Sequence, residues 1–173
     1  RPSPRDVYVS PSLVREFTLT AGARVACAAA STAKGLRAAE ITAVCGLKPE
    51  DFSRRTRING LTAVNPDHRI PLGCSGTLSM RIIDLVAPVG RGTRGLIVSP
   101  PRAGKTTLLE ETANAVSDCC KSSRLIVLLL DERPEEVTHF RRSTRGMVLA
   151  SSSDEPPESH VRLSEMTYAL ARC

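Results

Sequence analysis

The stretch Ser99-Pro100-Pro101-Arg102-Ala103-Gly104-Lys105-Thr106 decides the fold of this chain. An apolar run, residues 95–98, precedes it, and a run with helical character, residues 107–116, follows it. A strand, a tight loop that ends in Gly-Lys-Thr and a helix together predict a phosphate-binding loop. The backbone N–H groups of such a loop and the positive end of the helix dipole both face a bound anion.

The side chains at the end of this loop suit phosphate chemistry. Gly104 lets the backbone approach a ligand because it has no Cβ atom. The Lys105 ammonium can lie between the terminal phosphates of a nucleotide, and the Thr106 hydroxyl can ligate Mg²⁺. Ser99 stands where the usual motif has its first glycine, and the two prolines after it fix φ and remove two N–H donors. A chance Gly-Lys-Thr in a surface loop is the alternative, and the strand and helix expected around it argue against that alternative.

Strand-like and helix-like segments alternate through the C-terminal two thirds of the chain. Strands are expected over residues 78–86, 95–98, 124–130 and 146–150, and helices over 107–116, 134–143 and 158–172. The continuous apolar run before Asp131 is typical of a parallel strand that is covered on both faces. The alternation therefore predicts the α/β class with a parallel sheet.

A smaller, mainly β segment is expected before this α/β part. Residues 6–10 favour a short strand, and a short helix is expected over residues 11–17, starting at a proline. The alanine-rich stretches 23–28 and 37–44 alternate as two strands do, although alanine also favours helix. The polar segment 48–57 is expected to be a connector.

Composition narrows the class of protein. The 173 residues are 41% hydrophobic, which suits one domain or slightly more. The net charge of +6 permits a polyanionic partner, but aromatic residues, at 3%, are few for a complete RNA-stacking surface. The sequence has neither a signal-peptide pattern nor an apolar run that could span a membrane, which favours a cytoplasmic protein. The six cysteines form no C-x-x-C pair and are expected to be reduced thiols.

The tripeptide Asp131-Glu132-Arg133 directly follows the long apolar strand. In open α/β sheets, ligands bind at the carboxyl ends of the strands. Glu132 is therefore placed to act as a general base or to position water near a γ-phosphate, and Arg133 can neutralise phosphate charge. A solvated cluster at the start of a helix explains the same residues, and their spacing alone leaves both interpretations open.

Two segments closely resemble the transcription termination factor Rho family. They are Pro88–Thr106, which contains Gly-Arg-Gly-Thr-Arg-Gly and Ala-Gly-Lys-Thr, and Leu128–Thr138, which contains Asp-Glu-Arg-Pro-Glu-Glu. The similarity covers nearly the whole chain and is weakest over residues 21–59. Ser99 falls where this family commonly has a small residue other than glycine, so the departure from the usual motif is typical of the family.

The resemblance implies a homo-hexameric, RNA-dependent ATPase and helicase that acts in transcription termination. Its implied cofactors are ATP and Mg²⁺, and its implied partners are nascent RNA, RNA polymerase and elongation factors, without a membrane. It implies three parts: residues 1–20 as the tail of an N-terminal RNA-binding domain, 21–60 as a β-rich connector, and 61–173 as the N-terminal part of a RecA-like ATPase domain. That domain would be a P-loop NTPase with an incomplete parallel sheet.

The resemblance also implies roles for individual residues. Lys105 and Glu132 would be catalytic, and Thr106 would ligate the metal. Nucleotide contacts are implied for Gly90, Arg91, Gly92, Thr93, Arg94, Gly95, Arg102, Ala103, Gly104, Lys105, Thr106, Thr107 and Arg133. Arg102 replaces a usual lysine, and Thr107 stands where a methionine often packs on the adenine, so a lower affinity for the base is expected.

Three functional alternatives follow from these features. The first is the Rho-like ATPase, whose arginine finger and further RNA loops are expected beyond Cys173, so that this chain alone would be inactive. The second is a truncated or degenerate paralogue that binds nucleotide or RNA without hydrolysis. The third, a rotary-ATPase-like subunit, shares Gly-Arg-Gly but lacks the Asp-Glu-Arg-Pro-Glu-Glu run.

Overall fold

The computed structural model describes residues 3, 5–33, 35–56, 58–100 and 102–173. Contacts divide the chain into two units: Ala63–Leu163, and Arg1–Thr62 together with Ser164–Cys173. The three-part division at residues 20 and 60 stays a prediction. Within the described ranges, no helix combines the length and the apolar character needed to cross a membrane.

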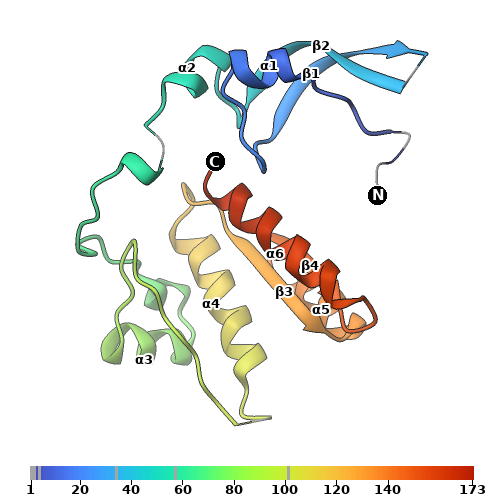
Figure 1. Ribbon diagram of the computed structural model, residues 1–173. Helices are drawn as coiled ribbons and strands as arrows, with labels where there is room; N and C mark the ends of the chain where they lie inside the picture. Colours follow the sequence, from blue (N-terminus) through green and yellow to red (C-terminus); the bar gives the residue numbers. More distant parts are fainter. Residues whose placement is uncertain (1–2, 4, 34, 57, 101) are drawn as a thin grey trace. The chain divides into compact units, whose positions relative to one another are not determined.

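The unit Ala63–Leu163 contains a parallel pair of strands with a helical crossover. Strands β3 (Ile126–Glu132) and β4 (Met147–Ser152) pair in parallel, and helix α5 (Pro134–Ser143) connects them (Figure 1). Helix α6 (Pro157–Ala171) follows β4. These elements confirm the strands and helices expected in this part of the chain, and with them the mixed α/β class.

Helix α5 forms because its sequence suits both ends and one buried face. Pro134 occupies the first turn, where a missing N–H costs nothing, and acidic residues there face the positive end of the helix dipole. Val137 and Phe140 lie one turn apart and are buried against Leu129 of β3. This cluster fixes α5 on the strand pair at the point where β3 ends.

A second cluster joins three helical elements. The 3-10 helix η2 (Leu72–Ser75) and helix α3 (Leu78–Val86) pack against helix α4 (Lys105–Cys119). Their contact buries Leu72, Met80 and Ala115, each at most 1% exposed. Helix α4 confirms the helix expected after the phosphate loop.

The strand expected over residues 78–86 is wrong, because this segment is helix α3. Alternation of Leu78, Met80 and Ile82 with polar residues favours a strand locally. In the helix, Met80 and Ile83 lie three residues apart and share one face, with which they contact the cluster of Leu72 and Ala115. Tertiary packing thus overrides a local strand preference here.

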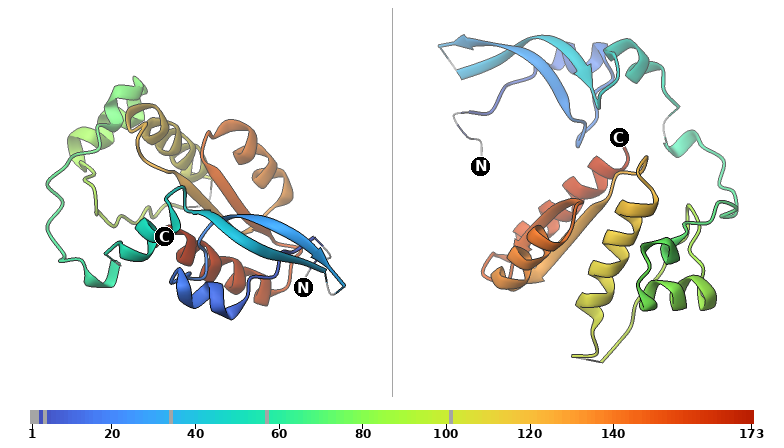
Figure 2. Two further views of the ribbon diagram at one scale, coloured as in Figure 1. Left: turned by 90° about the horizontal axis from the view of Figure 1, so that it is seen from above. Right: turned by 180° about the vertical axis from the view of Figure 1, so that it is seen from behind.

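The strand expected over residues 95–98 is not formed either. Residues 95–98, in the chain between α3 and α4, lie outside the strand pairs (Figures 1 and 2). Leu96 and Val98 are 87% and 82% exposed. A strand requires hydrogen-bonding neighbours, and none of the described strands pairs with this segment.

The other unit contains the antiparallel hairpin of β1 (Val25–Thr32) and β2 (Gly35–Val44), seen in both views of Figure 2. It confirms the two alanine-rich strands. This unit also contains helices α1 (Pro11–Glu16) and α2 (Pro49–Arg54), the 3-10 helix η1 (Ile58–Gly60) and the C-terminal end of α6. Its core consists of buried Ile41, Val44 and Phe52, with partly buried Leu13 and Phe17 packed against them.

Two smaller expectations in this unit need correction. The segment expected as a strand over residues 6–10 makes only an isolated bridge, from Tyr8 to Arg37. The segment expected as a connector over residues 48–57 contains helix α2, which begins at Pro49 and buries Phe52. The guanidinium carbon of Arg55 lies 3.4 Å from the centre of the Phe52 ring, so a cation covers the outer face of this core.

The expectation of six reduced thiols is also wrong. Cys74 and Cys119 form a disulfide, with 6.2 Å between their Cα atoms, while Cys27, Cys45, Cys120 and Cys173 are free. The partners are 45 residues apart in sequence, so no motif of closely spaced cysteines predicts the pair. The packing of η2 on α4 brings them together.

Asp84 of α3 connects this helix, α3, to η2 by a hydrogen bond. Its carboxylate accepts hydrogen bonds from the Gly73 backbone N–H at 2.9 Å and from the Arg69 guanidinium at 3.2 Å. The hydrogen bond from Gly73 is the main cause that lowers the pKa of Asp84, with Arg69 contributing and partial burial opposing. The ionised carboxylate is therefore the form that the folded chain stabilises.

We expect Asp84→Asn to lower the melting temperature at neutral pH by several degrees, because a charge-assisted hydrogen bond is lost. The contribution of a carboxyl with a lowered pKa is present above its ordinary pKa and is lost as the pH falls through the lowered value. The difference between variant and parent should thus shrink in acid. Thermal unfolding at several pH values measures this, with the exposed Asp67→Asn as the control. An equal difference at all pH values would contradict it.

Candidate functional site

A sharp turn places the phosphate loop at the N-terminus of α4. Gly104 precedes the helix with φ 83°, in the left-handed region that glycine adopts without strain. Its carbonyl accepts the first helical hydrogen bond, from the Leu108 N–H at 2.9 Å. No side chain caps this helix end, so its first N–H groups are available to an anion.

An open cavity of about 570 Å³ lies beside this turn. It brings together five of the residues predicted from the sequence: Arg102, Gly104, Lys105, Thr106 and Glu132. The wall is completed by Ser99, Pro100 and Glu136. Pro101, which was expected to stiffen the loop, lies outside the described residues. Two cationic side chains and a helix N-terminus therefore share one cavity with two carboxyl groups.

An irregularity at the end of β3 places Glu132 in that wall. Leu130 pairs with Ser151 and Glu132 pairs with Ser152, so Asp131 is an extra residue in the ladder. Asp131 has φ 57°, the left-handed conformation that few side chains adopt. Such a bulge bends the strand and changes the direction of the next side chain, and it recurs beside functional sites.

The environment of Glu132 favours its protonated form. Burial is the largest cause that raises its pKa, and the charge of Glu136 and a hydrogen bond with that carboxyl raise it further. The Lys105 ammonium acts in the opposite direction, which places its charge within electrostatic reach of Glu132. A carboxyl whose pKa is moved toward neutrality is a better general base than an ordinary one.

We expect Glu136→Gln to lower the pKa of Glu132, because it removes both a negative neighbour and the carboxyl that shares a hydrogen bond. Burial still acts on Glu132, so its pKa should stay above the ordinary value. Carbon-detected NMR titration of the Glu132 carboxyl measures the change. Glu135→Gln, on the same helical turn but outside the cavity wall, is the control and should leave the titration unchanged.

Polar contacts join the two helices that carry the cavity wall. Glu110 of α4 pairs with His139 of α5 at 2.9 Å and accepts a hydrogen bond from the Ser143 hydroxyl. One turn further along α4, the Asn114 amide donates to the Ser143 carbonyl at 3.1 Å. The spacing of four residues puts these groups on one face of α4. The helix that begins at the phosphate loop and the helix that carries Glu136 are therefore held together.

A second cavity, of about 410 Å³, also adjoins the phosphate loop and shares Ser99, Gly104 and Lys105 with the first. Ala103 and Thr107, both predicted nucleotide contacts, line this cavity rather than the first. Ser99 and Glu111 also line it, and the Ser99 Oγ and Glu111 Oε2 atoms are buried without a hydrogen-bond partner. Buried polar atoms without partners are costly, so they favour a ligand that supplies hydrogen bonds.

Other predicted site residues lie elsewhere. Residues 90–95, all described, line neither cavity. Gly90 and Thr93 close a turn, with the Gly90 N–H donating to the Thr93 hydroxyl at 3.0 Å, and the Arg91 N–H donates to the His68 carbonyl at 2.8 Å. Arg133 precedes α5 as its exposed N-cap and is also absent from both walls.

Sequence reasoning missed Glu136 and Glu111. Glu136 comes four residues after Glu132 in an acidic first helical turn, a pattern that was explained by the helix dipole alone. Glu111 comes two turns into α4, within a run that simply predicts helix. Both residues could have been suggested from the sequence, because each is an ionisable residue on the face of its helix that is directed toward the phosphate loop.

The first cavity offers oxygen ligands that suit Mg²⁺. Its wall contains the Thr106 hydroxyl and the Glu132 and Glu136 carboxyl groups. Magnesium prefers oxygen donors and is usually held by one or two protein groups together with substrate phosphates. The described residues contain no cluster of three His, Cys, Asp or Glu that could hold a metal alone. The donor set thus fits a metal that arrives with a phosphorylated ligand.

Comparison with known proteins shows which family and which relatives this chain resembles. Residues 79–173 match the model of the ATP synthase alpha/beta family, nucleotide-binding domain. The chain is 40% identical over 178 residues to a protein named transcription termination factor Rho from Cereibacter sphaeroides, which covers 99% of this chain. It is 43% identical over 174 residues to the protein of that name from Bacillus subtilis, covering 98% of this chain.

These relatives are longer than this chain. The alignments cover 42% of the Cereibacter sphaeroides protein and 41% of the Bacillus subtilis protein. In Streptomyces lividans, the protein of the same name is 41% identical over 178 residues, which make up 25% of its length. The resemblance predicted from residues 88–106 and 128–138 is thus confirmed over nearly the whole chain, as a match to part of each relative.

Proposed function

Since this chain belongs to the ATP synthase alpha/beta family through its nucleotide-binding domain, we propose that it binds ATP at the phosphate loop and works as part of an RNA-stimulated ATPase in transcription termination. One observation carries the proposal. Lys105 and Thr106 share a cavity with Glu132, a carboxyl whose pKa is raised. The identity to proteins named Rho supports the choice of this ATPase class.

The proposed chemistry gives a role to each group that lines the cavity. The N-terminal N–H groups of α4 and the Lys105 ammonium bind the phosphates. The Thr106 hydroxyl would hold Mg²⁺, which when bound neutralises charge on the phosphates. Glu132 orients the attacking water and accepts its proton, and Glu136 keeps the pKa of Glu132 raised for this task.

The predicted site residues outside the cavity would also serve the nucleotide, and the protein would act with partners. Arg133 and the loop 90–95 would approach the nucleotide only after a rearrangement. Nascent RNA, RNA polymerase and elongation factors are the proposed partners, with a homo-hexamer as the proposed assembly and the cytoplasm as the place of action. The net charge of +6 agrees with an RNA partner.

Two other functions remain distinct from this proposal. A paralogue that binds nucleotide or RNA without hydrolysis would keep Lys105 functional and leave Glu132 without a catalytic role. A rotary-type subunit would hydrolyse ATP without any response to RNA, and the absence of the Asp-Glu-Arg-Pro-Glu-Glu run from that class argues against it.

The test is the RNA dependence of ATP hydrolysis by the full product of the gene that encodes this chain. We expect single-stranded RNA to raise the rate at least about tenfold, because RNA binding is proposed to complete the catalytic arrangement. A rate of ATP hydrolysis that is the same with and without RNA would favour the rotary class instead. Binding of ATP without any hydrolysis would favour the paralogue.

A further inference from the structure

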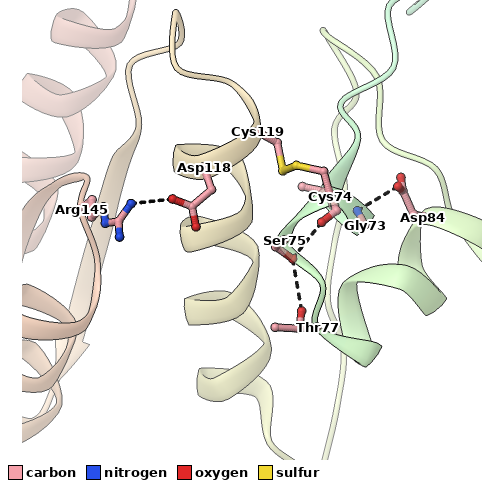
Figure 3. The surroundings of a disulfide bond; sticks show 9 residues. Gly73, Cys74, Ser75, Thr77, Asp84, Asp118, Cys119 and Arg145 are labelled. Carbon is pink, nitrogen blue, oxygen red and sulfur yellow. Dashed lines mark hydrogen bonds and ion pairs between the residues drawn. A yellow bond between two sulfur atoms is a disulfide. The ribbon is translucent and has the colours of Figure 1, made fainter.

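The Cys74–Cys119 disulfide joins the two ends of the segment that carries the phosphate loop. Cys74 lies in η2 and Cys119 is the last residue of α4, as Figure 3 shows. The Cα atoms are 6.2 Å apart, within the usual range for a disulfide. The bond closes a loop that runs from η2 to the C-terminus of α4. This loop therefore contains the phosphate loop, residues 99–106.

The parts that the bond connects are also held by contacts that do not need it. Leu72 is buried with Ala115 across the η2–α4 contact, and the Gly73 N–H donates to the Asp84 carboxylate at 2.9 Å (Figure 3). The end of α4 is closed by the Cys120 N–H, which donates to the Val116 carbonyl at 2.9 Å. With the bond open, the two sulfurs would still lie close together, so that the bond can form again.

The bond is accessible from solvent. Cys74 is exposed, and Cys119 is partly buried. Exposed disulfides exchange with external thiols far more readily than those buried in a core. A free thiol, Cys120, directly follows Cys119 in sequence, but it is bonded to neither partner.

We propose that Cys74 and Cys119 form a reversible thiol–disulfide exchange site whose reaction partner is a dithiol reductant. A thiolate of the reductant attacks the sulfur of Cys74, the more exposed of the two residues, and Cys119 leaves as a thiolate that takes up a proton. The second thiol of the reductant then attacks the mixed disulfide and releases Cys74 as a thiol. The protein gains two electrons and two protons, and the reductant becomes a disulfide.

The exchange controls the mobility of the phosphate-loop helix. In the oxidised state, the C-terminal end of α4 is covalently fixed to η2, and the closed loop has fewer unfolded conformations. In the reduced state, α4 is held to η2 by packing without a covalent bond, while its polar contacts with α5 remain. This inference goes beyond the proposed nucleotide chemistry and is tested without any measurement of ATP.

The first measurement counts thiols in the full chain. Protein that is purified in air and unfolded without reductant should show four reactive thiols of the six cysteines, and peptide mapping should find Cys74 linked to Cys119. Treatment of the folded protein with about 1 mM dithiothreitol should raise the count to six. Oxidised glutathione should then restore the same link. Six thiols at the start, a bond that resists dithiothreitol until the chain is unfolded, or a new link through Cys120 would each overturn the proposal.

The second measurement is hydrogen exchange of the oxidised and reduced chain. Reduction should speed exchange of the α4 amides at least about tenfold and leave the β1–β2 hairpin unchanged. Cys74→Ser should exchange like the reduced parent in both conditions, and the matched control Cys120→Ser should respond like the parent. Equal exchange of α4 in oxidised and reduced parent protein would overturn the proposal without any need for a variant.

Discussion

Lys105→Ala is expected to lower the affinity of the chain for Mg·ATP by about 30- to 1,000-fold, because removal of one partner of a close charge pair costs about 2–4 kcal/mol. Lys105 begins α4 and lines the same cavity as Thr106. Arg102 is the only other cation among the described residues that line the two cavities beside the loop, and its planar guanidinium cannot reproduce the compact point charge of the ammonium. In the full gene product, the same change should abolish RNA-stimulated hydrolysis.

Calorimetric titration with Mg·ATP measures the loss of affinity. Lys121→Ala is the matched control, since Lys121 is an exposed lysine just after the same helix and outside both cavities. It should bind like the parent. If Lys105→Ala retained parental affinity and parental hydrolysis, the phosphate-binding role of this loop would be refuted.

Glu132→Gln is expected to separate binding from hydrolysis. The amide keeps the size of the side chain but cannot accept a proton, so the hydrolysis rate of the full gene product should fall by about 10²- to 10⁴-fold. The affinity for Mg·ATP should change little, because Lys105 and the α4 N-terminus are proposed to bind the phosphates. Rate measurements with saturating ATP and RNA check this, with Glu135→Gln as the control, since Glu135 lies in the first turn of α5 but outside the cavity wall. A loss of affinity equal to the loss of rate would assign Glu132 to binding instead.

The same variant should also change stability with a defined dependence on pH. A carboxyl whose folded pKa is raised contributes stability below its ordinary pKa, and that contribution is lost as the pH rises through the raised value. Glutamine does not ionise. The melting temperature of Glu132→Gln relative to the parent should therefore increase from acidic to neutral pH, by about 1–3 °C. A constant difference would mean that the folded environment does not penalise the charge of Glu132.

Local sequence patterns predicted the phosphate loop and its neighbours well. Gly104 has the positive φ that only glycine adopts easily, and α4 begins at Lys105. The apolar run before Asp131 is β3, and Pro134 begins α5. These features depend on neighbours within a few residues in sequence, so periodicity and helix-start signals are sufficient for them.

Features that depend on distant contacts could not be predicted in the same way. Residues 78–86 alternate like a strand, yet Met80 packs on Ala115, more than thirty residues away, and the segment is helical. Cys74 and Cys119 meet for the same reason. Residues 95–98 have strand character but find no strand to pair with among the described residues.

The candidate site shows the same division. Sequence alone indicated Lys105, Thr106 and Glu132, because the loop motif and the end of β3 are local patterns. Glu136 joins them only because α5 folds back on β3, where its charge and hydrogen bond act on Glu132. The bulge at Asp131 is likewise a property of the pairing with β4. These contributions to the chemistry of the cavity come from tertiary structure.

NMR of the isotope-labelled chain can map directly where Mg·ATP binds. We expect the amide signals of Gly104, Lys105 and Thr106 to move most on titration, Glu132 to respond with them, and Lys105→Ala to abolish the response. The hairpin of β1 and β2 should not respond. Saturable binding that leaves the signals of Gly104–Thr106 unchanged, or no binding at all by the parent chain, would show that this loop is not the nucleotide site.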